Sequence, residues 1–192
     1  MLWEFDDTLK KRKLKLVAEG YDAYCLFTLQ GLELNIAEEI NNNYDYCLAT
    51  PLTKMSHRSR KGKKYDVQEV LLGGYIFLFM EKGRDVYKIR SARNYFRILS
   101  RNNDDGKLYG RDLAYAEWVL EQEGCISVSE AIKLNGRVRI VGGPLKELEG
   151  NIVEYSKRNR NCCIEIDFLG QTIKTWLPFN WIDIDTSELQ IK

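Results

Sequence analysis

Short apolar runs alternate with amphipathic segments through the first two thirds of the chain. Residues 23–29 are apolar and aromatic and predict a buried strand. A four-residue apolar period from Leu32 to Ile40 then predicts a helix, which ends at a run of three asparagines. Residues 46–55 are typical of a second strand.

Strands and helices continue to alternate up to about residue 124. The further predicted elements are a strand over 70–80 with a bend or bulge at Gly73-Gly74, a short helix over 85–91, a strand over 95–99 and a helix from Asp112, as its cap, to near Gly124. This order predicts an α+β sandwich in which helices pack on a mostly antiparallel sheet.

The last third of the chain has a different pattern of hydrophobic positions. It holds only short strand-like runs, at 137–141, 150–156, 162–168, 171–177 and 181–184. Five short strands in about 50 residues predict a small five-stranded β-barrel. The predicted organisation is therefore an extension over 1–22, an α/β domain over 23–124, a linker over 125–134 and a barrel domain over 135–186.

Two polar segments have less defined patterns. The extension contains the basic cluster from Lys10 to Lys15, which fits either a short amphipathic helix or a solvated tail. Residues 56–64 are polar and basic without an apolar period, which predicts a loop or the tip of a hairpin.

Composition indicates a folded protein of one mid-sized or two small domains. The chain has 192 residues, of which 44% are hydrophobic and 30% are charged. Its formal net charge is only +1, so the molecule as a whole is not a generic binder of polyanions. Any contact with nucleic acid must come from local segregation of charge.

Positive charge is segregated in two segments. Residues 54–64 contain six Lys or Arg and no acid, and residues 82–101 contain seven Lys or Arg against Asp85, a local charge of 7 − 1 = +6. Such segments bind phosphates through counterion release, and Tyr87 and Tyr95 can add base stacking. A solvated face is the commoner fate of a charge run, but the near absence of acids favours binding.

Several kinds of chemistry find no support in the sequence. The five cysteines have no C-x-x-C spacing and only His57 could join them, which argues against a zinc site or a disulfide scaffold and favours reduced thiols. His57 fits a polar loop residue. Without a nucleophile–base constellation or a phosphate-binding loop, we expect no enzyme, no cofactor and no metal. The lack of a membrane-spanning or signal segment leads us to expect a cytoplasmic protein.

The stretch from Gly142 to Gly150 carries the first family signal. Three glycines and a proline at fixed offsets, between strand-like runs, predict a turn that joins two strands of the small barrel. The pattern resembles a KOW motif, as found at the C-terminal end of NusG-type transcription elongation factors, and implies a barrel of the SH3-like type. The turn residues that it implies are Gly143, Pro144 and Gly150.

Upstream segments resemble the N-terminal (NGN) domain of the same family. Gln30-Gly31-Leu32-Glu33 is similar to the family's glycine and polar helix start after its first strand. Leu71 to Phe79 stands in place of an apolar pair running into F-P-G-Y-[IV]-[FL]-[VF], and Tyr87 to Ser91 looks like H-L-[IV]-R-S. The resemblance covers roughly residues 23–184, and the ordered combination is more specific than any one motif.

Departures from the family pattern indicate a specialised paralog. Leu72 replaces a phenylalanine, Gly73 a proline, Ala23 a tryptophan and Glu147 a glycine. The KOW segment and the basic turn Lys157-Arg158-Asn159-Arg160 look most like LoaP-type antiterminators, and the strand 47–51 resembles that of RfaH.

The resemblance implies an apolar patch that docks on the clamp helices of the largest subunit of RNA polymerase. The matching positions are Phe27, Leu72, Tyr75 and Phe77. Aromatics at a period of two are also typical of a buried core, and the resemblance outweighs that reading most clearly for Tyr75 and Leu72.

The resemblance also favours nucleic-acid binding by the basic segments. The candidate contacts are Arg58, Arg60, Lys61, Lys63, Lys64, Lys88, Arg90, Arg93 and Arg97. RfaH-like proteins place basic residues on their first helix to read DNA, whereas the predicted helix over 32–40 carries three glutamates and no Lys or Arg. A structured nascent RNA is therefore favoured over non-template DNA, with Lys88, Arg90 and Arg93 as core contacts.

These features predict a specialised elongation factor that promotes processive antitermination after recruitment by a nascent RNA hairpin. We expect a monomer whose barrel binds a further, unidentified protein partner. The alternative is a ribosome-associated RNA-binding protein, because KOW barrels also occur in ribosomal proteins.

Overall fold

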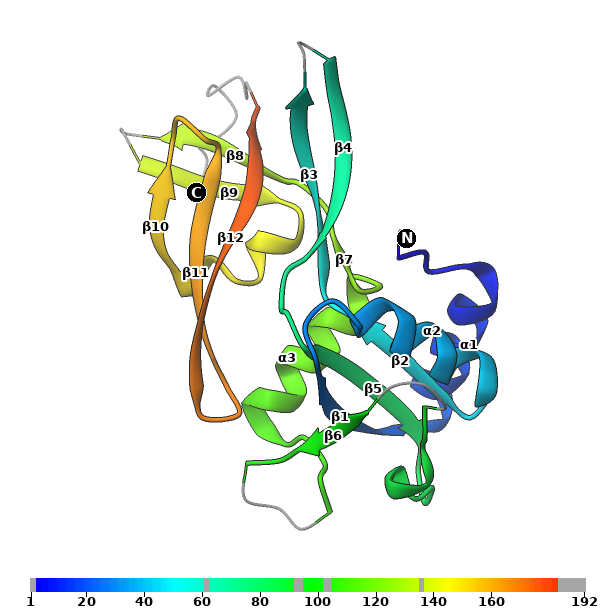
Figure 1. Cartoon of the computed structure of the whole chain (residues 1–192). Coiled ribbons are helices and arrows are strands. Elements are labelled where there is room, and N and C mark those ends of the chain that lie inside the picture. The colour runs from blue at the N-terminus through cyan, green and yellow to red at the C-terminus, as the bar shows by residue number, and fades with distance from the viewer. Residues whose placement is uncertain (1–2, 61–62, 92–94, 102–104, 135–136, 183–192) are drawn as a thin grey trace. The chain divides into compact units, whose positions relative to one another are not determined.

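The computed structural model describes residues 3–60, 63–91, 95–101, 105–134 and 137–182 (Figure 1). The chain forms two compact units. The first comprises Met1–Ile126 together with Asp167–Gln171, and the second comprises Ser127–Ile166 and Thr172–Lys192.

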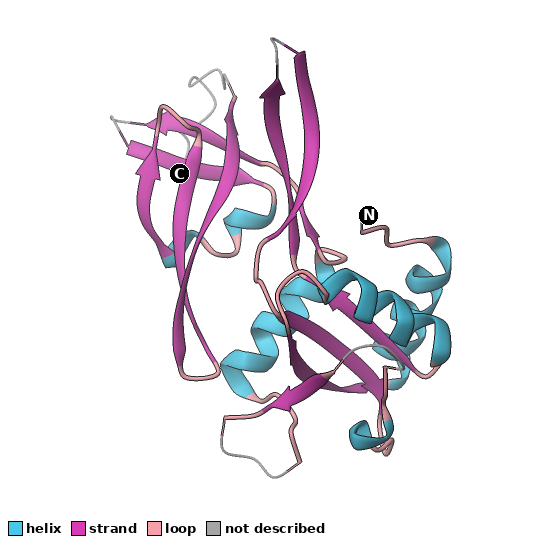
Figure 2. Ribbon diagram, viewed as in Figure 1, coloured by secondary structure: helices cyan, strands magenta, loops and turns pink. Residues whose placement is uncertain are grey.

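The first unit is built on a four-stranded antiparallel sheet. Its strand order is β2-β5-β1-β6, with β2 at Cys47–Pro51, β5 at Tyr75–Glu81, β1 at Tyr21–Thr28 and β6 at Phe96–Leu99. The same unit contains helices α1 (Asp7–Glu19), α2 (Glu33–Asn43) and α3 (Gly110–Glu121) (Figure 2). The predicted α+β class with an antiparallel sheet is confirmed.

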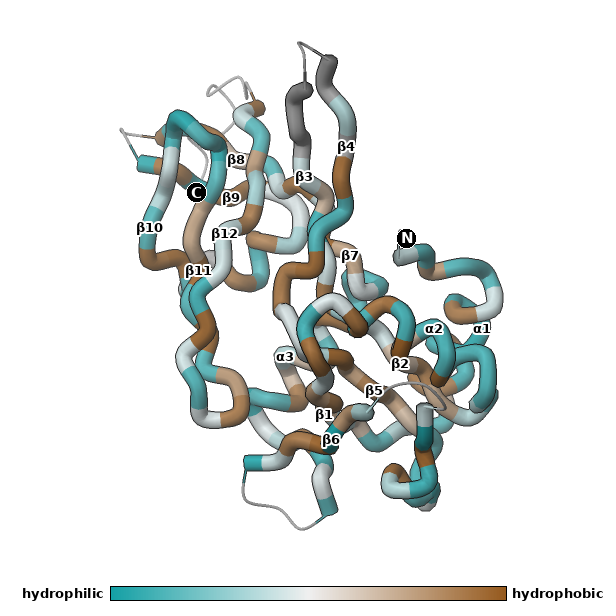
Figure 3. Tube along the Cα trace, in the orientation of Figure 1, coloured by the Kyte–Doolittle hydropathy of each residue, from teal (hydrophilic) through white to brown (hydrophobic). Residues whose placement is uncertain are grey.

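Successive side chains of β5 point to opposite faces of the sheet, and both faces are buried. Ile76, Leu78 and Met80 belong to a buried cluster that includes Ile36 and Ile40 of α2. On the opposite side of β5, Phe77 and Phe79 are fully buried, and the Phe77 ring lies 5.8 Å from that of Tyr115 on α3. Hydrophobic positions accordingly follow one another along β5, which is covered on both faces (Figure 3).

A second, smaller sheet extends the first unit. Strands β3 (Thr53–Arg60) and β4 (Lys63–Val70) form a long antiparallel hairpin, and β7 (Cys125–Ile126) pairs parallel with the base of β3. The single strands predicted over 46–55 and 70–80 are therefore wrong in extent, because each divides at a turn or break between two sheets. The polar segment 56–64 is largely strand, since pairing in a hairpin requires no buried face.

The N-terminal segment forms helix α1, so the structure selects the amphipathic alternative over a solvated tail. The Asp6 carboxylate caps the helix by accepting a hydrogen bond from the Leu9 amide at 2.8 Å. Leu9 and Leu16 are buried, and α1 packs against β2 and β5. Two of its lysines form ion pairs outside the helix, Lys13 with Glu123 at 3.4 Å and Lys15 with Glu81 at 2.6 Å.

The second unit is a five-stranded sheet in the order β10-β11-β12-β8-β9. Its strands are β8 (Ser129–Leu134), β9 (Arg137–Gly142), β10 (Ile152–Ser156), β11 (Asn161–Phe168) and β12 (Gln171–Trp181). Five strands were predicted, but the predicted linker over 125–134 contains β7 and β8. The run predicted at 171–177 lies within β12, which continues to Trp181 and whose end pairs parallel with β8. Of the run predicted at 181–184, residues 183–184 lie outside the described residues.

Candidate functional site

Three side chains form a row across the sheet of the first unit. Phe27 on β1 is the direct cross-strand neighbour of Tyr75 on β5 and of Arg97 on β6. The Phe27 and Tyr75 rings meet edge to face with centroids 5.2 Å apart, and the Arg97 guanidinium lies 5.1 Å from the Phe27 centroid. Both rings are half-buried and Arg97 is exposed. We call these three residues the aromatic row.

The other two residues of the predicted polymerase patch lie deeper. Phe77 is fully buried, and its ring lies 5.5 Å from that of Phe168. Phe168 belongs to the part of the first unit that residues 167–171 contribute. Leu72 is 8% exposed, and its carbonyl accepts a hydrogen bond from the Tyr75 amide at 3.3 Å. Both side chains are buried, and their role in binding stays a prediction.

Leu29 is an apolar surface residue that the sequence reasoning missed as a site residue. It follows β1 directly and is 74% exposed. Its position at the end of the apolar run 23–29 predicts burial, so the sequence pattern carried no signal of its exposure. Leu29 thus adds an exposed apolar side chain two residues after Phe27.

Glu33 fixes the two turns that flank the aromatic row. Its carboxylate is buried and accepts hydrogen bonds from the Gly74 amide at 2.5 Å and the Gly31 amide at 2.8 Å. Gly74 has φ +84°, and a Cβ there would lie 2.9 Å from the Phe27 ring and from the Thr28 carbonyl oxygen. Glu33 thus joins the start of α2 to the Leu72–Tyr75 turn, and only glycine fits beneath Phe27.

Replacing Glu33 by alanine is expected to lower the free energy of unfolding by about 2 to 4 kcal/mol. The change leaves the buried Gly74 amide without its acceptor, at a cost of roughly 1 to 3 kcal/mol, and it also removes the acceptor of the more exposed Gly31 amide. Chemical denaturation measures this loss. Glu38→Ala, an exposed position on the same helix, is the matched control and should change stability by less than about 0.5 kcal/mol. Equal stabilities of the two variants would contradict the bracing role.

Lys88 and Arg90 lie on the segment that follows β5. Lys88 ends the 3₁₀ turn η1 (Val86–Lys88), and both side chains are exposed. The Arg90 guanidinium donates to the carbonyl oxygens of Tyr87 and Ile89, which orients it along its own turn. Lys88, Arg90 and Arg97 are therefore predicted nucleic-acid contacts that the structure places at the surface.

Two other arginines of the basic segment 82–101 are committed to ion pairs. Arg84 bonds to Glu81 at 3.0 Å and lies over the Tyr46 ring at 4.5 Å. Arg101 bonds to the buried Asp112 at 3.2 Å and to Asp167 at 3.2 Å. Asp112 also accepts from the Leu169 amide at 2.8 Å, so it does not cap α3 as predicted. The local charge available for phosphates is smaller than the sequence count indicates.

The remaining predicted basic contacts fall on or near the tip of the β3–β4 hairpin. The register pairs Arg60 with Lys63, Ser59 with Lys64 and Arg58 with Tyr65. For these basic positions the structure describes the backbone, which places them at the far end of the hairpin. Lys61 and Arg93 lie outside the described residues, so their role stays a prediction.

The predicted glycine–proline turn connects β9 to β10 in the second unit. Gly143 has φ +80°, and a Cβ there would lie 2.7 Å from the Cα of Ser129. Pro144 opens the 3₁₀ turn η2 (Pro144–Lys146), and the buried Leu145 donates its amide to the Ser129 hydroxyl at 3.0 Å. A Cβ at Gly150 would meet no atom within 4 Å, so packing does not require glycine there. The turn is thus held on β8.

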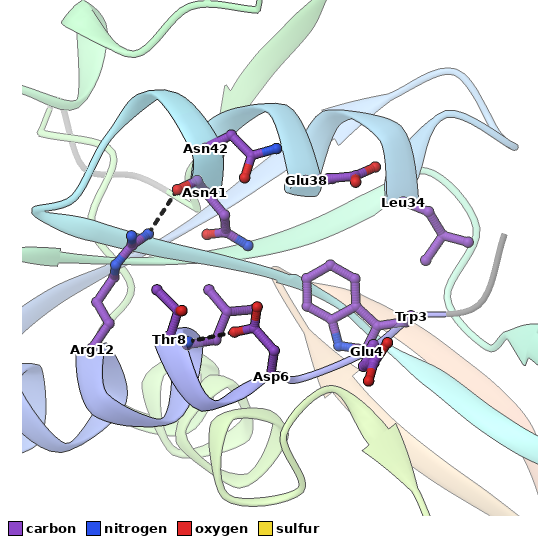
Figure 4. Close-up of a pocket in the computed structure, with 10 residues that line it drawn as sticks. Trp3, Glu4, Asp6, Thr8, Arg12, Leu34, Glu38, Asn41 and Asn42 are labelled. Atoms are coloured by element: carbon purple, nitrogen blue, oxygen red, sulfur yellow. Dashed lines mark hydrogen bonds between the residues drawn. The ribbon is translucent and has the colours of Figure 1, made fainter.

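A polar pocket of about 330 Å³ lies between α1 and α2. Trp3 and Leu34 line one end and Arg12 the other (Figure 4). One guanidinium nitrogen of Arg12 donates to the carbonyl oxygens of Asn41 at 3.0 Å, Tyr44 at 3.0 Å and Cys47 at 2.9 Å. Sequence reasoning placed Arg12 only in a basic cluster and missed this role.

The cysteines, the possible metal ligands and the helices of the described residues were the remaining subjects of the sequence predictions. All five cysteines are free thiols and four are buried, and burial raises the pKa of the Cys47 thiol to about 12. Among the described residues, no group of three or more His, Cys, Asp or Glu side chains is arranged to hold a metal ion. Within the same set, no helix has the length and apolar character to cross a bilayer.

Comparison with known proteins shows a structural similarity but no match in sequence. No family model matches the sequence, and no curated protein matches it. Among solved structures, the chain is similar to one described as domain interaction in NusG of Thermotoga maritima. The similarity covers 84% of this chain and 95% of that one, with a TM-score of 0.48 and 17% sequence identity.

Proposed function

We propose that this chain is a specialised transcription elongation factor of the NusG type, which binds RNA polymerase through Phe27 and Tyr75 of the aromatic row. The observation that carries the proposal is the half-buried Phe27–Tyr75 pair. Tyr75 ends the segment whose sequence resembles the family's F-P-G-Y motif. Aromatic residues at the centre of a patch are frequent hot spots of protein interfaces. The clamp helices of the polymerase are the proposed partner, because that resemblance implies them.

Nucleic-acid contact is the second part of the proposal. Lys88, Arg90 and Arg97 are exposed. Arg97 lies on the edge strand β6, and the other two lie on the segment that precedes it. Helix α2 carries Glu33, Glu38 and Glu39 without a basic residue, which disfavours DNA reading by that helix. Nascent RNA is therefore the proposed ligand, and its hairpin recruits the factor to chosen operons.

The second unit supplies a separate binding module in this mechanism. Its turn at Gly143 and Pro144 resembles a KOW motif, and its partner is proposed to be a further protein. Covalent linkage raises the local concentration of that partner at the polymerase without high intrinsic affinity. The combined effect is suppression of pausing and termination by a monomeric factor in the cytoplasm.

The test is a terminator read-through assay with purified polymerase, on templates with and without the leader hairpin. We expect the protein to raise read-through only when the leader RNA contains the hairpin. Read-through that is unchanged by removing the hairpin would defeat RNA recruitment. Binding to ribosomes without binding to polymerase would instead support the alternative of a ribosome-associated RNA-binding protein.

A further inference from the structure

The pocket between α1 and α2 combines an apolar wall with carboxylates. Trp3 and Leu34 form the apolar wall, and the side chains of Glu4, Asp6 and Glu38 also line the space (Figure 4). Its volume of about 330 Å³ lies at the lower end of the range of roughly 300 to 1,000 Å³ that is typical of small-molecule sites. We call it the Trp3 pocket. It shares no residue with the aromatic row, so what it binds is independent of the proposed polymerase contact.

Trp3 is held in the wall of the pocket by hydrogen bonds to two distant elements. Its indole nitrogen donates to the carbonyl oxygen of Glu123, just after α3, at 3.1 Å. Its backbone amide donates to the side-chain oxygen of Gln68 on β4, and its carbonyl oxygen accepts from the Gln68 side-chain nitrogen at 3.2 Å. The indole is therefore in position before any ligand binds, and the face of the half-buried ring is what it can offer to one.

The pocket holds more negative than positive charge. Arg12, the cationic side chain among its lining residues, is already used by the fold, since its guanidinium donates to three carbonyl oxygens. Asp6 is used in part as the cap of α1. Glu4 and Glu38 are exposed, and within the described part of the chain neither forms an ion pair. This excess of carboxylates favours a cation as the ligand.

The walls of the pocket favour an organic cation over a metal ion. Mg²⁺ and Ca²⁺ require several oxygen ligands that converge at roughly 2.0 to 2.6 Å. Among the residues that the structure describes, no group of three or more His, Cys, Asp or Glu side chains could hold a metal ion. An ammonium or guanidinium group is instead attracted to the face of an indole ring, the strongest aromatic partner for cations. Its aliphatic stem can lie against Leu34, as long cationic side chains do on apolar surface.

We propose that the Trp3 pocket binds the ammonium or guanidinium group of an organic cation, either a free polyamine or a lysine or arginine side chain of another protein. The cationic group lies on the Trp3 ring and is neutralised by Glu4 and Glu38, while carbon atoms of the ligand contact Leu34. Trp3 and Glu4 precede α1, whereas Leu34 and Glu38 belong to α2. The bound cation therefore links the N-terminal segment to α2 and raises the melting temperature of the chain.

The experiment measures binding to the full chain by isothermal titration calorimetry with three probes. These are spermidine, a capped Gly-Arg-Gly peptide, and the same peptide with the neutral isostere citrulline in place of arginine. We expect binding of at least one of the two cationic probes and none of the citrulline peptide. The tighter of the two cationic probes identifies the source of the ligand.

Two variants test the two halves of the pocket. Trp3→Leu keeps an apolar side chain but removes the ring, and is expected to weaken binding roughly 2- to 30-fold, which corresponds to losing a cation–π contact of ~0.5–2 kcal/mol. Replacing Glu4 and Glu38 together by glutamine is also expected to weaken binding roughly 2- to 30-fold, at ~0.2–1 kcal/mol for each exposed ion pair. Glu19→Gln removes an exposed carboxylate of α1 outside the pocket and should have no effect.

Thermal unfolding of each variant accompanies the binding measurement. Trp3→Leu also loses the indole hydrogen bond to Glu123, so a lower melting temperature is expected for it. The double glutamine variant breaks no ion pair within the described residues, so it decides the question if Trp3→Leu does not fold.

The outcomes separate the Trp3 pocket from the proposed function. Cation binding that is weakened by both pocket variants supports the pocket whether or not the chain binds polymerase. Absence of binding by both cationic probes, or equal binding of the arginine and citrulline peptides, would overturn the proposal. Binding that Glu19→Gln weakens as much as the double glutamine variant, with full affinity in folded Trp3→Leu, would show general attraction to an acidic surface and would also overturn it.

Discussion

A chain in which Phe27 and Tyr75 are both replaced by alanine is expected to bind the clamp helices of RNA polymerase roughly 30- to 1,000-fold more weakly. This range corresponds to losing ~2–4 kcal/mol, as for a central aromatic hot spot. The two rings contact each other edge to face, so removing one also leaves the other less well positioned. Affinity is measured with an immobilised clamp-helix fragment.

The double variant must remain folded for this result to be informative. Both side chains are half-buried, so a modest decrease in melting temperature is expected without loss of the cooperative transition. Tyr109→Ala, at an exposed tyrosine outside the aromatic row, is the matched control and should retain full affinity. Full affinity of the folded double variant would show that the aromatic row is not the polymerase contact.

Replacing Arg12 by alanine is expected to lower the free energy of unfolding by about 2 to 4 kcal/mol. One guanidinium group serves three carbonyl oxygens, those of Asn41, Tyr44 and Cys47. Hydrogen bonds from a charged donor contribute roughly 1.5 to 3 kcal/mol each, but the adjoining pocket lets water replace part of the loss. Two of the acceptors lie at the C-terminal end of α2, where a cation also interacts favourably with the helix dipole.

Neighbouring substitutions distinguish geometry from charge in this prediction. Lys11→Ala removes an exposed cation from the same helix and should change stability by less than about 0.5 kcal/mol. Arg12→Lys keeps the charge but replaces the guanidinium nitrogen that reaches all three carbonyl oxygens by an ammonium on a shorter side chain, so an intermediate loss is expected in urea denaturation. If Arg12→Ala and Lys11→Ala proved equally stable, the three carbonyl contacts would contribute nothing to the free energy of unfolding.

Periodicity predicted those elements whose side chains pack on one defined face. The α2 period from Leu32 to Ile40 and the apolar runs of β1 and β5 correspond to buried side chains in the structure. The β3–β4 hairpin was predicted only as a loop or hairpin tip over 56–64, because its strands are stabilised mainly by mutual backbone pairing. Such pairing leaves little trace in the hydrophobic pattern.

The candidate site was predictable as a set of segments but not as a set of accessible atoms. Tyr75 and Phe77 occupy the same face of β5, yet Phe77 is covered by other rings while Tyr75 is partly open. Alternation along a strand determines the face, whereas exposure depends on what packs over that face from elsewhere in the chain. The same reasoning explains why charge counting could not foresee that Asp112 binds Arg101.

The parallel pairing of β12 with β8 has a consequence for biosynthesis. Phe179 of β12 pairs with Ser129 of β8, so the second unit cannot close its sheet while the intervening residues are still being translated. At about 5 to 20 residues per second, the delay between completing β8 and reaching Phe179 is about 2 to 9 seconds. During that interval the nascent β8 lacks its β12 neighbour, which makes this strand a site for chaperone protection and, in truncated chains, for aggregation.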